Sequence, residues 1–189
     1  EGVTSIPHNA FSYASFIKKV NMPNTLAEIR DHAFSFCTSL ETPIFPESLS
    51  KIGYYAYYGC TNIGNMEFPD SLTSIEGYAF GNCTGLTEMD LPDSVKNIGY
   101  RAFYNCSSIS SFTYPKGWET ASNNIFEGCS SLTEITIPEG VTVIPHNAFS
   151  GATYLKKVNL PSALLEIGEQ AFSNCTSLET PIFPESLSK

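Results

Sequence analysis

Apolar and polar positions along the chain repeat with one strict period. Proline stands at every twenty-third position from Pro23 to Pro184. An aliphatic column with this period contains Ile6, Ile29, Ile52, Ile75, Ile98, Ala121, Ile144 and Ile167. A second column contains Val3, Leu26, Leu49, Leu72, Val95, Trp118, Val141, Leu164 and Leu187. Repetition this strict, without any insertion, indicates a solenoid in which each unit buries its apolar side chains against its neighbours.

Two further columns lie between these aliphatic positions. The pair Ala-Phe recurs at 10–11, 33–34, 79–80, 102–103, 148–149 and 171–172, with Ala56-Tyr57 and Ile125-Phe126 in register. Cysteine follows at Cys37, Cys60, Cys83, Cys106, Cys129 and Cys175, and Ala14 and Ala152 take the same position in two repeats. We expect the phenylalanines to pack between successive coils and the cysteines to occupy a position that requires a small buried side chain.

The chain also contains a duplication that is much longer than the single repeat. Residues 1–51 match residues 139–189 at an offset of six repeats, and 37–51 are identical to 175–189. Neither end shows the atypical, polar repeat that usually caps a solenoid. The sequence therefore predicts a single solenoid over residues 1–189 that is a piece of a longer array.

Residues 86–108 show which elements one repeat forms. Met89 and Leu91 alternate with polar residues, which indicates a strand with one buried face, and Pro92 ends it. A turn at Asp93-Ser94 leads to a short second strand ending at Ile98. The spacing of Ala102, Phe103 and Cys106 favours one helical or 3₁₀ turn. We thus expect an α/β-type solenoid of about eight coils, with strands stacked in parallel about 4.8 Å apart.

The same residues carry a resemblance to a known family. Leu86-x-x-Met89-x-Leu91 resembles the strand motif of leucine-rich repeats, and the continuation through Pro92, Ile98-Gly99 and Ala102-Phe103-x-x-Cys106 is similar to the BspA type, also called the Treponema pallidum type. The resemblance implies a parallel concave sheet with short second strands and single turns on the convex side. It also implies an extracellular, surface-displayed adhesion module that performs no chemistry.

The chain departs from this pattern in two places. Pro43 and Pro181 stand where an inward aliphatic side chain of the strand is expected, which puts a strand there in doubt. In the sixth repeat Trp118 and Ala121 replace the usual aliphatic pair, and we expect the large and small side chains together to conserve core volume.

Composition and charge exclude several classes of protein. Hydrophobic residues make up 42% of the chain and charged residues 15%, a composition typical of a folded chain rather than a disordered one. A formal net charge of −9 disfavours nucleic acid as a partner. No apolar run is long enough to predict a membrane span, and no signal peptide is recognisable.

Candidate catalytic and metal-binding residues are few. The cysteines are expected to be structural thiols, since alanine replaces them twice and no Cys-x-x-Cys motif occurs, with disulfides or a metal site as less favoured alternatives. His8, His32 and His146 lack the spacing of zinc ligands and are expected to face solvent. The chain contains neither a nucleophile elbow nor a phosphate-binding loop, so we predict no enzyme activity, no metal and no cofactor.

Two surfaces are candidates for binding a partner. The preferred one is a cluster on the convex side that we call the tyrosine ridge: Tyr54, Tyr55, Tyr58, Tyr78, Tyr100, Arg101 and Tyr104. Tyrosine and arginine are enriched where binding energy concentrates in interfaces. The alternative is an acidic stretch of the concave face formed by Glu67, Glu88 and Asp90, which would prefer a basic partner. For both surfaces, ordinary solvent exposure is the competing interpretation.

These features favour a non-catalytic module, at a cell surface or secreted, that adheres to a host or partner protein or another extracellular macromolecule. A passive spacer and an intracellular interaction scaffold are the alternatives. The sequence does not identify the partner.

Overall fold

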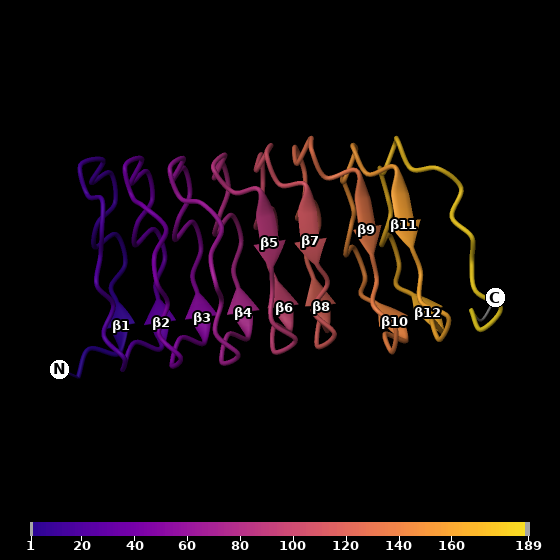
Figure 1. Cartoon of the computed structure of the whole chain (residues 1–189), viewed down its shortest axis with the longest axis horizontal. Helices are drawn as coiled ribbons and strands as arrows, with labels where there is room; N and C mark the ends of the chain where they lie inside the picture. The colour runs from indigo at the N-terminus through magenta and orange to yellow at the C-terminus, as the bar shows by residue number, and fades with distance from the viewer. Residues whose placement is uncertain (1, 188–189) are drawn as a thin grey trace.

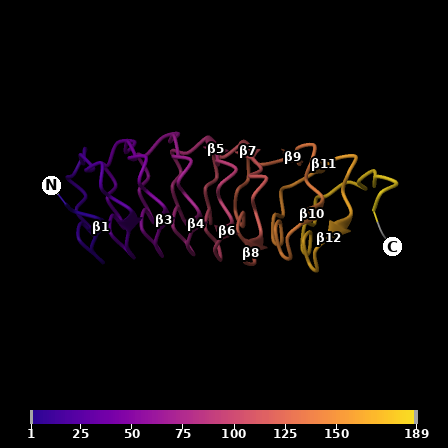
Figure 2. The same ribbon diagram turned by 90° about the horizontal axis from the view of Figure 1, so that it is seen from below.

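The computed structural model describes residues 2–187 as a continuous stack of similar coils. Both views show the coils following one another along a single axis from the N-terminal to the C-terminal end (Figures 1 and 2). Residue 1 and residues 188–189, the ends of the predicted domain, lie outside the described residues. Residues 2–187 contain no helix long and apolar enough to cross a membrane.

The second strand of each repeat forms the most regular column of the fold. Its members are β1 (Ser5–Ile6), β2 (Glu28–Ile29), β3 (Lys51–Ile52), β4 (Ser74–Ile75), β6 (Asn97–Ile98), β8 (Thr120–Ala121), β10 (Val143–Ile144) and β12 (Glu166–Ile167). They pair in parallel, six in one sheet and β10 with β12 in another, and Ile52 lies opposite Ile75 in the register that the period predicts. The isoleucines of these strands face the interior, which confirms the predicted short second strands.

Within the described residues, the first strand of the repeat is assigned only between residues 88 and 159. It forms β5 (Glu88–Asp90), β7 (Ser111–Thr113), β9 (Glu134–Thr136) and β11 (Lys157–Asn159), which pair in parallel as β5 with β7 and β9 with β11. Met89, Phe112, Ile135 and Val158 point inward, and their neighbours are mostly exposed. We call this side of the solenoid the first-strand face.

No strand is assigned at 42–44 or 180–182 within the described chain, which confirms the doubt about Pro43 and Pro181. Proline has no amide hydrogen to donate to a neighbouring strand. The equivalent segments 19–21 and 65–67, which flank Pro43 in the adjacent coils, are also not assigned as strands. The interruption therefore extends over three successive coils.

The number of coils is slightly smaller than expected. Seven steps of one repeat each lead from β1 to β12, so the chain completes about seven turns rather than eight. The difference arises because eight successive second strands are separated by only seven complete coils.

The predicted helical or 3₁₀ turns are wrong. Residues 2–187 contain no helix, and the segment after each second strand is a series of tight turns. In the third repeat the amides of Tyr55, Tyr57 and Gly59 donate to carbonyls of the next coil at 2.7–3.0 Å. The intervening amides donate to carbonyls three residues back in the same coil. The backbone of the turn thus alternates between bonds to its own coil and bonds to its neighbour, a pattern that a helix does not have.

Left-handed residues impose this conformation. One residue at the start of each turn has a positive φ, and its column contains Asn9, His32, Tyr55, Tyr78, Arg101, Asn124, Asn147 and Gln170. A second left-handed residue follows four positions later: Tyr13, Phe36, Gly59, Asn82, Asn105, Gly128, Gly151 and Asn174. Since a right-handed helix cannot include residues with positive φ, two of them in five positions prevent a helical turn.

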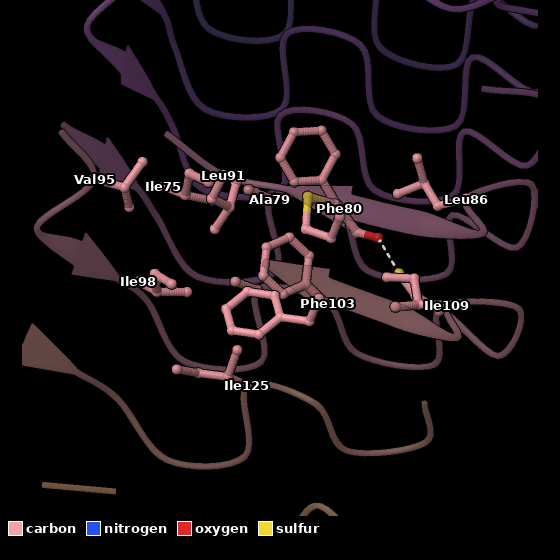
Figure 3. Close-up of a cluster of buried hydrophobic side chains, with 14 of the residues drawn as sticks. Ile75, Ala79, Phe80, Leu86, Leu91, Val95, Ile98, Phe103, Ile109 and Ile125 are labelled. Atoms are coloured by element: carbon pink, nitrogen blue, oxygen red, sulfur yellow. Dashed lines mark hydrogen bonds between the residues drawn. The ribbon is translucent and has the colours of Figure 1, made fainter. Parts of the chain in front are cut away.

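Aromatic rings fill the centre of the coils. The column Phe34, Tyr57, Phe80, Phe103, Phe126 and Phe149 is almost fully buried, and successive rings are stacked with centroids 5.2–6.0 Å apart. Figure 3 shows Phe80 and Phe103 surrounded by the aliphatic columns, among them Ile75 and Ile98. This arrangement confirms the predicted core columns.

The cysteine column lies beside these rings and is hydrogen-bonded. Each of the six free thiols donates to a carbonyl of the preceding coil, as Cys106 does to Phe80 at 2.9 Å (Figure 3). The same carbonyl of Phe80 also accepts the amide of Cys83, so it serves two donors. Burial raises the pKa of Cys60 and Cys106 to about 12. The thiols are therefore protonated donors within the core.

We expect the thiols of the folded protein to resist alkylation at mildly alkaline pH, because the reactive thiolate is nearly absent when the pKa is about 12. Cys175, which is only partly buried and whose pKa is about 11, should react first. Mass spectrometry after alkylation with and without denaturant measures this order. Bridged cysteines before denaturation, or a Cys83 that reacts as fast as Cys175, would contradict the assignment.

The same thiols should make stability depend on pH. Their folded-state pKa lies above the ordinary value of 9.0, so the unfolded chain loses protons first as the pH rises. The contribution of the thiols to the free energy of unfolding should be constant below about pH 8 and fall between about pH 9 and 12. Denaturant titrations across this range measure the effect, and a Cys106→Ala variant should show a smaller slope.

Truncation of Phe103 to alanine should lower the free energy of unfolding by about 3–5 kcal/mol, because the ring is fully buried between two coils. Tyr154→Ser, at an exposed position outside the ring contacts, should lower it by less than about 1 kcal/mol. Chemical denaturation measures both values. Equal losses would show that the assignment of the core column is wrong.

Tyr57→Phe should raise the free energy of unfolding by about 1 kcal/mol. The Tyr57 hydroxyl is buried and lacks a hydrogen-bond partner among the described residues, and burying such a group is unfavourable. Phenylalanine already occupies this position in neighbouring coils. A loss of stability in the same denaturation experiment would show that the hydroxyl has a partner.

Candidate functional site

The tyrosine ridge is a network of rings on the tight turns of the third to fifth repeats. Tyr55 and Tyr78 are stacked, with ring centroids 4.7 Å apart and an angle of 8° between the ring planes. Tyr58 lies edge-on to both rings, at 5.3 and 6.1 Å. Tyr78 in turn contacts Tyr100 and Tyr104 edge-on, at 5.5 and 5.8 Å. The structure therefore brings together five of the six tyrosines through direct ring contacts.

Tyr54 belongs to the same surface but packs differently. Its ring lies against Gly77 of the next coil, where a β-carbon would be only 3.0 Å from the ring. Tyr58 lies in the same way over Gly81, where a β-carbon would approach the ring to 2.7 Å. Two glycines thus provide the space in which tyrosines of the preceding coil pack against the turn.

Arg101 lies among Tyr78, Tyr100 and Tyr104 of the ridge. Its guanidinium group lies 5.0 Å from the ring centroids of Tyr100 and Tyr104 and donates a hydrogen bond of 2.9 Å to the Tyr78 hydroxyl. It also forms a two-point hydrogen bond to the carboxylate of Glu127, with distances of 2.8 and 3.0 Å. The bond to Tyr78 and the pairing with Glu127 raise the pKa of Arg101. The charge of Arg101 is already paired within the chain, so the ridge offers aromatic surface rather than a free cation.

The ridge has three further neighbours, two of which, His32 and Glu127, sequence reasoning missed. The ring of His32 is stacked on Tyr55 at 4.8 Å, and Phe36 contacts Tyr58 edge-on at 5.4 Å. Glu127 lies 26 residues from Arg101 and becomes its partner only when the coils stack. His32 was detectable, because it shares the column of Tyr55 and Tyr78 at the period of the repeat.

The backbone of the ridge is unusual for these residue types. His32, Tyr55, Tyr78 and Arg101 all have φ between 53° and 58°. Three other repeats have asparagine in this column, and asparagine adopts the left-handed conformation most readily after glycine. Bulky residues at such positions cost of order 1 kcal/mol each. The turn itself therefore does not require rings in this column.

The histidines are ordinary surface residues apart from His32. His8 and His146 are exposed, as predicted. Nδ1 of His8 lies 3.5 Å from a carboxylate oxygen of Asp31, and Nδ1 of His146 accepts the amide of Glu169. No cluster of three or more histidine, cysteine or acidic side chains within residues 2–187 is arranged to hold a metal ion.

The first-strand face contains the second candidate set. Glu67, Glu88 and Asp90 are exposed, as predicted. Among the described residues, none of the three has a lysine, arginine or histidine within ion-pair distance. Two other carboxylates of this face are paired: Glu41 with Lys19 at 3.2 Å and Glu134 with Lys157 at 2.9 Å. The acidic stretch is therefore an uncompensated patch.

Comparison with solved structures shows three informative similarities. A leucine-rich repeat protein from Bacteroides ovatus is 31% identical, with a TM-score of 0.80 over 98% of this chain and 48% of that one. The T. pallidum leucine-rich repeat protein is 30% identical, with a TM-score of 0.69 over 82% of this chain and 72% of that one. A leucine-rich cell surface protein from Faecalibacterium prausnitzii is 28% identical, with a TM-score of 0.52 over 96% of this chain and 57% of that one.

The chain spans about half the length of the B. ovatus protein. A search of curated proteins found no match. The family model of the BspA type leucine-rich repeat region matches residues 4–132 and 119–189. Together with the regularly repeated coils and their parallel strands, this match shows that the chain belongs to the BspA-type leucine-rich repeat family.

Proposed function

We propose that this chain is a non-catalytic binding module, displayed at a cell surface or secreted, that adheres to a protein or another extracellular macromolecule through the tyrosine ridge. Membership of a leucine-rich repeat family supports a role in protein interaction. The F. prausnitzii relative is described as a cell surface protein, which supports the proposed location.

One observation carries the choice of surface. Bulky side chains occupy the left-handed column in four successive repeats, although asparagine in the same column of other repeats forms the same turn. The ring contacts offset part of this conformational cost, at about 0.5–1.5 kcal/mol per aromatic pair. The result is a preordered aromatic surface across three coils, which loses little side-chain entropy when a partner binds.

The charge distribution supports a partner that recognises rings and hydroxyl groups. The chain carries a net charge of −9, yet the ridge contains one cation, which is paired with Glu127. Its tyrosines offer apolar faces together with hydroxyl groups at their edges. Such a neutral, amphipathic surface binds through shape and aromatic contact, so its affinity should depend weakly on salt.

The test uses side chains that this chain itself places on the same turn. In the ridge variant, Tyr55 and Tyr78 become asparagine, as at Asn9 and Asn124, and Tyr58 and Tyr104 become serine, as at Ser12 and Ser173. In the control variant, Phe16→Ser and Tyr154→Ser remove two exposed rings outside the ridge. Serine occupies that position in other repeats, so both variants should fold.

We expect the wild-type chain and the control variant to bind epithelial cells or immobilised extracellular matrix proteins equally. The ridge variant should bind at least about tenfold more weakly, as loss of several central aromatic residues predicts. Binding of a fluorescently labelled chain, titrated in solution, measures the difference. Equal binding by both variants would exclude the ridge.

The two alternatives give other results in this assay. A passive spacer should bind no surface in any of the three forms. An intracellular scaffold should bind cytosolic proteins instead of cells or matrix, and its full-length gene should encode no signal peptide and no anchor.

A further inference from the structure

The first-strand face contains a hollow where its ladder is interrupted. Pro43 cannot donate a backbone hydrogen bond, and side chains replace the missing bonds in the neighbouring coils. The hydroxyl of Thr42 accepts the amide of Gly64 at 2.9 Å, and the carboxamide oxygen of Asn65 accepts the amides of Thr87 and Glu88, both at 3.0 Å. A hollow of about 550 Å³ lies between the coil that contains Pro43 and the coil that contains Asn65.

Five of the nine residues that line the hollow are apolar. Phe45 and Phe68 line it with their rings stacked at 5.5 Å, and Pro43 and Pro69 lie beside them. Ile44 lines the same hollow and is 88% exposed. An isoleucine that exposed, next to a hollow lined by phenylalanine and proline, leaves apolar surface uncovered.

Carboxylates surround this apolar surface. Glu47 and Glu67 line the hollow, and both are exposed. Glu88 and Asp90 follow on the next coil of the same face. Within residues 2–187, no cationic side chain lies within ion-pair distance of any of these four carboxylates. The charge that would complement this surface must therefore come from a partner.

We propose that the hollow at Pro43 binds an extended segment of a partner protein in which lysine or arginine stands next to an aliphatic residue. The aliphatic side chain would contact Ile44 and the rings of Phe45 and Phe68. The stem of the lysine or arginine would lie along the same apolar surface, and its charged end would reach Glu47 or Glu67. Partial burial beside the rings makes this pairing stronger than an exposed ion pair.

This site is separate from the tyrosine ridge. Its residues come from the first-strand segments of two successive repeats and the residues just after them, whereas the ridge lies on the turns that follow the second strand. The proposal therefore does not depend on the function of the ridge. The ridge variant described above should bind the peptides used below as the wild type does.

The duplication supplies matched controls within the chain. Ile182 and Glu185 are the copies of Ile44 and Glu47, and Ile182 is 92% exposed. The hollow beside Ile182 lies between its segment and the preceding coil, and Lys156, Lys157 and Glu179 line it. Replacing Ile182 therefore removes a similarly exposed isoleucine that has lysines as well as a carboxylate beside it.

The experiment measures binding of three short synthetic peptides by fluorescence anisotropy: one of lysine and leucine, one of lysine and serine, and one of glutamate and leucine. The chain should bind the lysine–leucine peptide at least about tenfold more tightly than either of the others, since only that peptide supplies both the apolar and the cationic contact. Binding should weaken as the salt concentration rises.

The variants separate this site from general attraction to an acidic protein. Two variants should each bind the lysine–leucine peptide about tenfold more weakly: the single variant Ile44→Ser, and the double variant Glu47→Gln with Glu67→Gln. Two control variants should change the affinity for this peptide by less than about twofold: the single variant Ile182→Ser, and the double variant Glu169→Gln with Glu185→Gln. Each variant should fold, because all the altered side chains are exposed. Thermal unfolding checks that it does.

Three results would overturn the proposal. Equal binding of the lysine–serine and lysine–leucine peptides would show that the apolar side chains of the hollow contribute nothing. Equal losses in the Glu47/Glu67 and Glu169/Glu185 variants would show that only net charge attracts the peptide. Unchanged binding by Ile44→Ser in a folded protein would place the site elsewhere.

Discussion

Hydrogen bonding between successive coils is the constraint on which the rest of this structure depends. Within residues 2–187 a single coil contains neither a helix nor a hairpin, so it satisfies only part of its backbone internally. Amides of the turn donate to the next coil, and amides of the second strand donate to the preceding one. Each residue must therefore face its equivalent in the neighbouring coil. The aliphatic, aromatic and cysteine columns follow from this register.

The sequence was sufficient to predict the parts of the fold that depend on burial. A column such as Ile29, Ile52 and Ile75 is visible because every repeat requires the same apolar side chain at the same place. The interruption at Pro43 was also predictable, because a proline excludes a backbone bond whatever surrounds it. Both inferences rest on properties of single residues repeated at a fixed period.

The turns were not predictable in the same way. The spacing of Ala102, Phe103 and Cys106 occurs in a helix, but it occurs equally in a turn whose alternate amides bond to another coil. The left-handed conformation of Tyr55 or Arg101 is not expected from residue type, and only the asparagines in the same column hint at it. For the candidate site, the crowding of tyrosines was visible in the sequence. The pairing of Arg101 with Glu127, and the glycines that make room for Tyr54 and Tyr58, required the stacked coils.

The register between coils also determines how such a protein can change its length. Removing or adding one residue would shift every later column against its neighbour, whereas removing or adding a complete repeat would bring equivalent faces together again. Recombination between repeats is therefore tolerated in whole units, and a surface such as the ridge is inherited as a block with its packing intact. The duplicated segments 1–51 and 139–189 differ at the exposed positions Tyr13 and Phe16, whereas the buried position of Leu155 changes only between isoleucine and leucine. These differences fit a history in which copying precedes divergence that falls mainly on the surface.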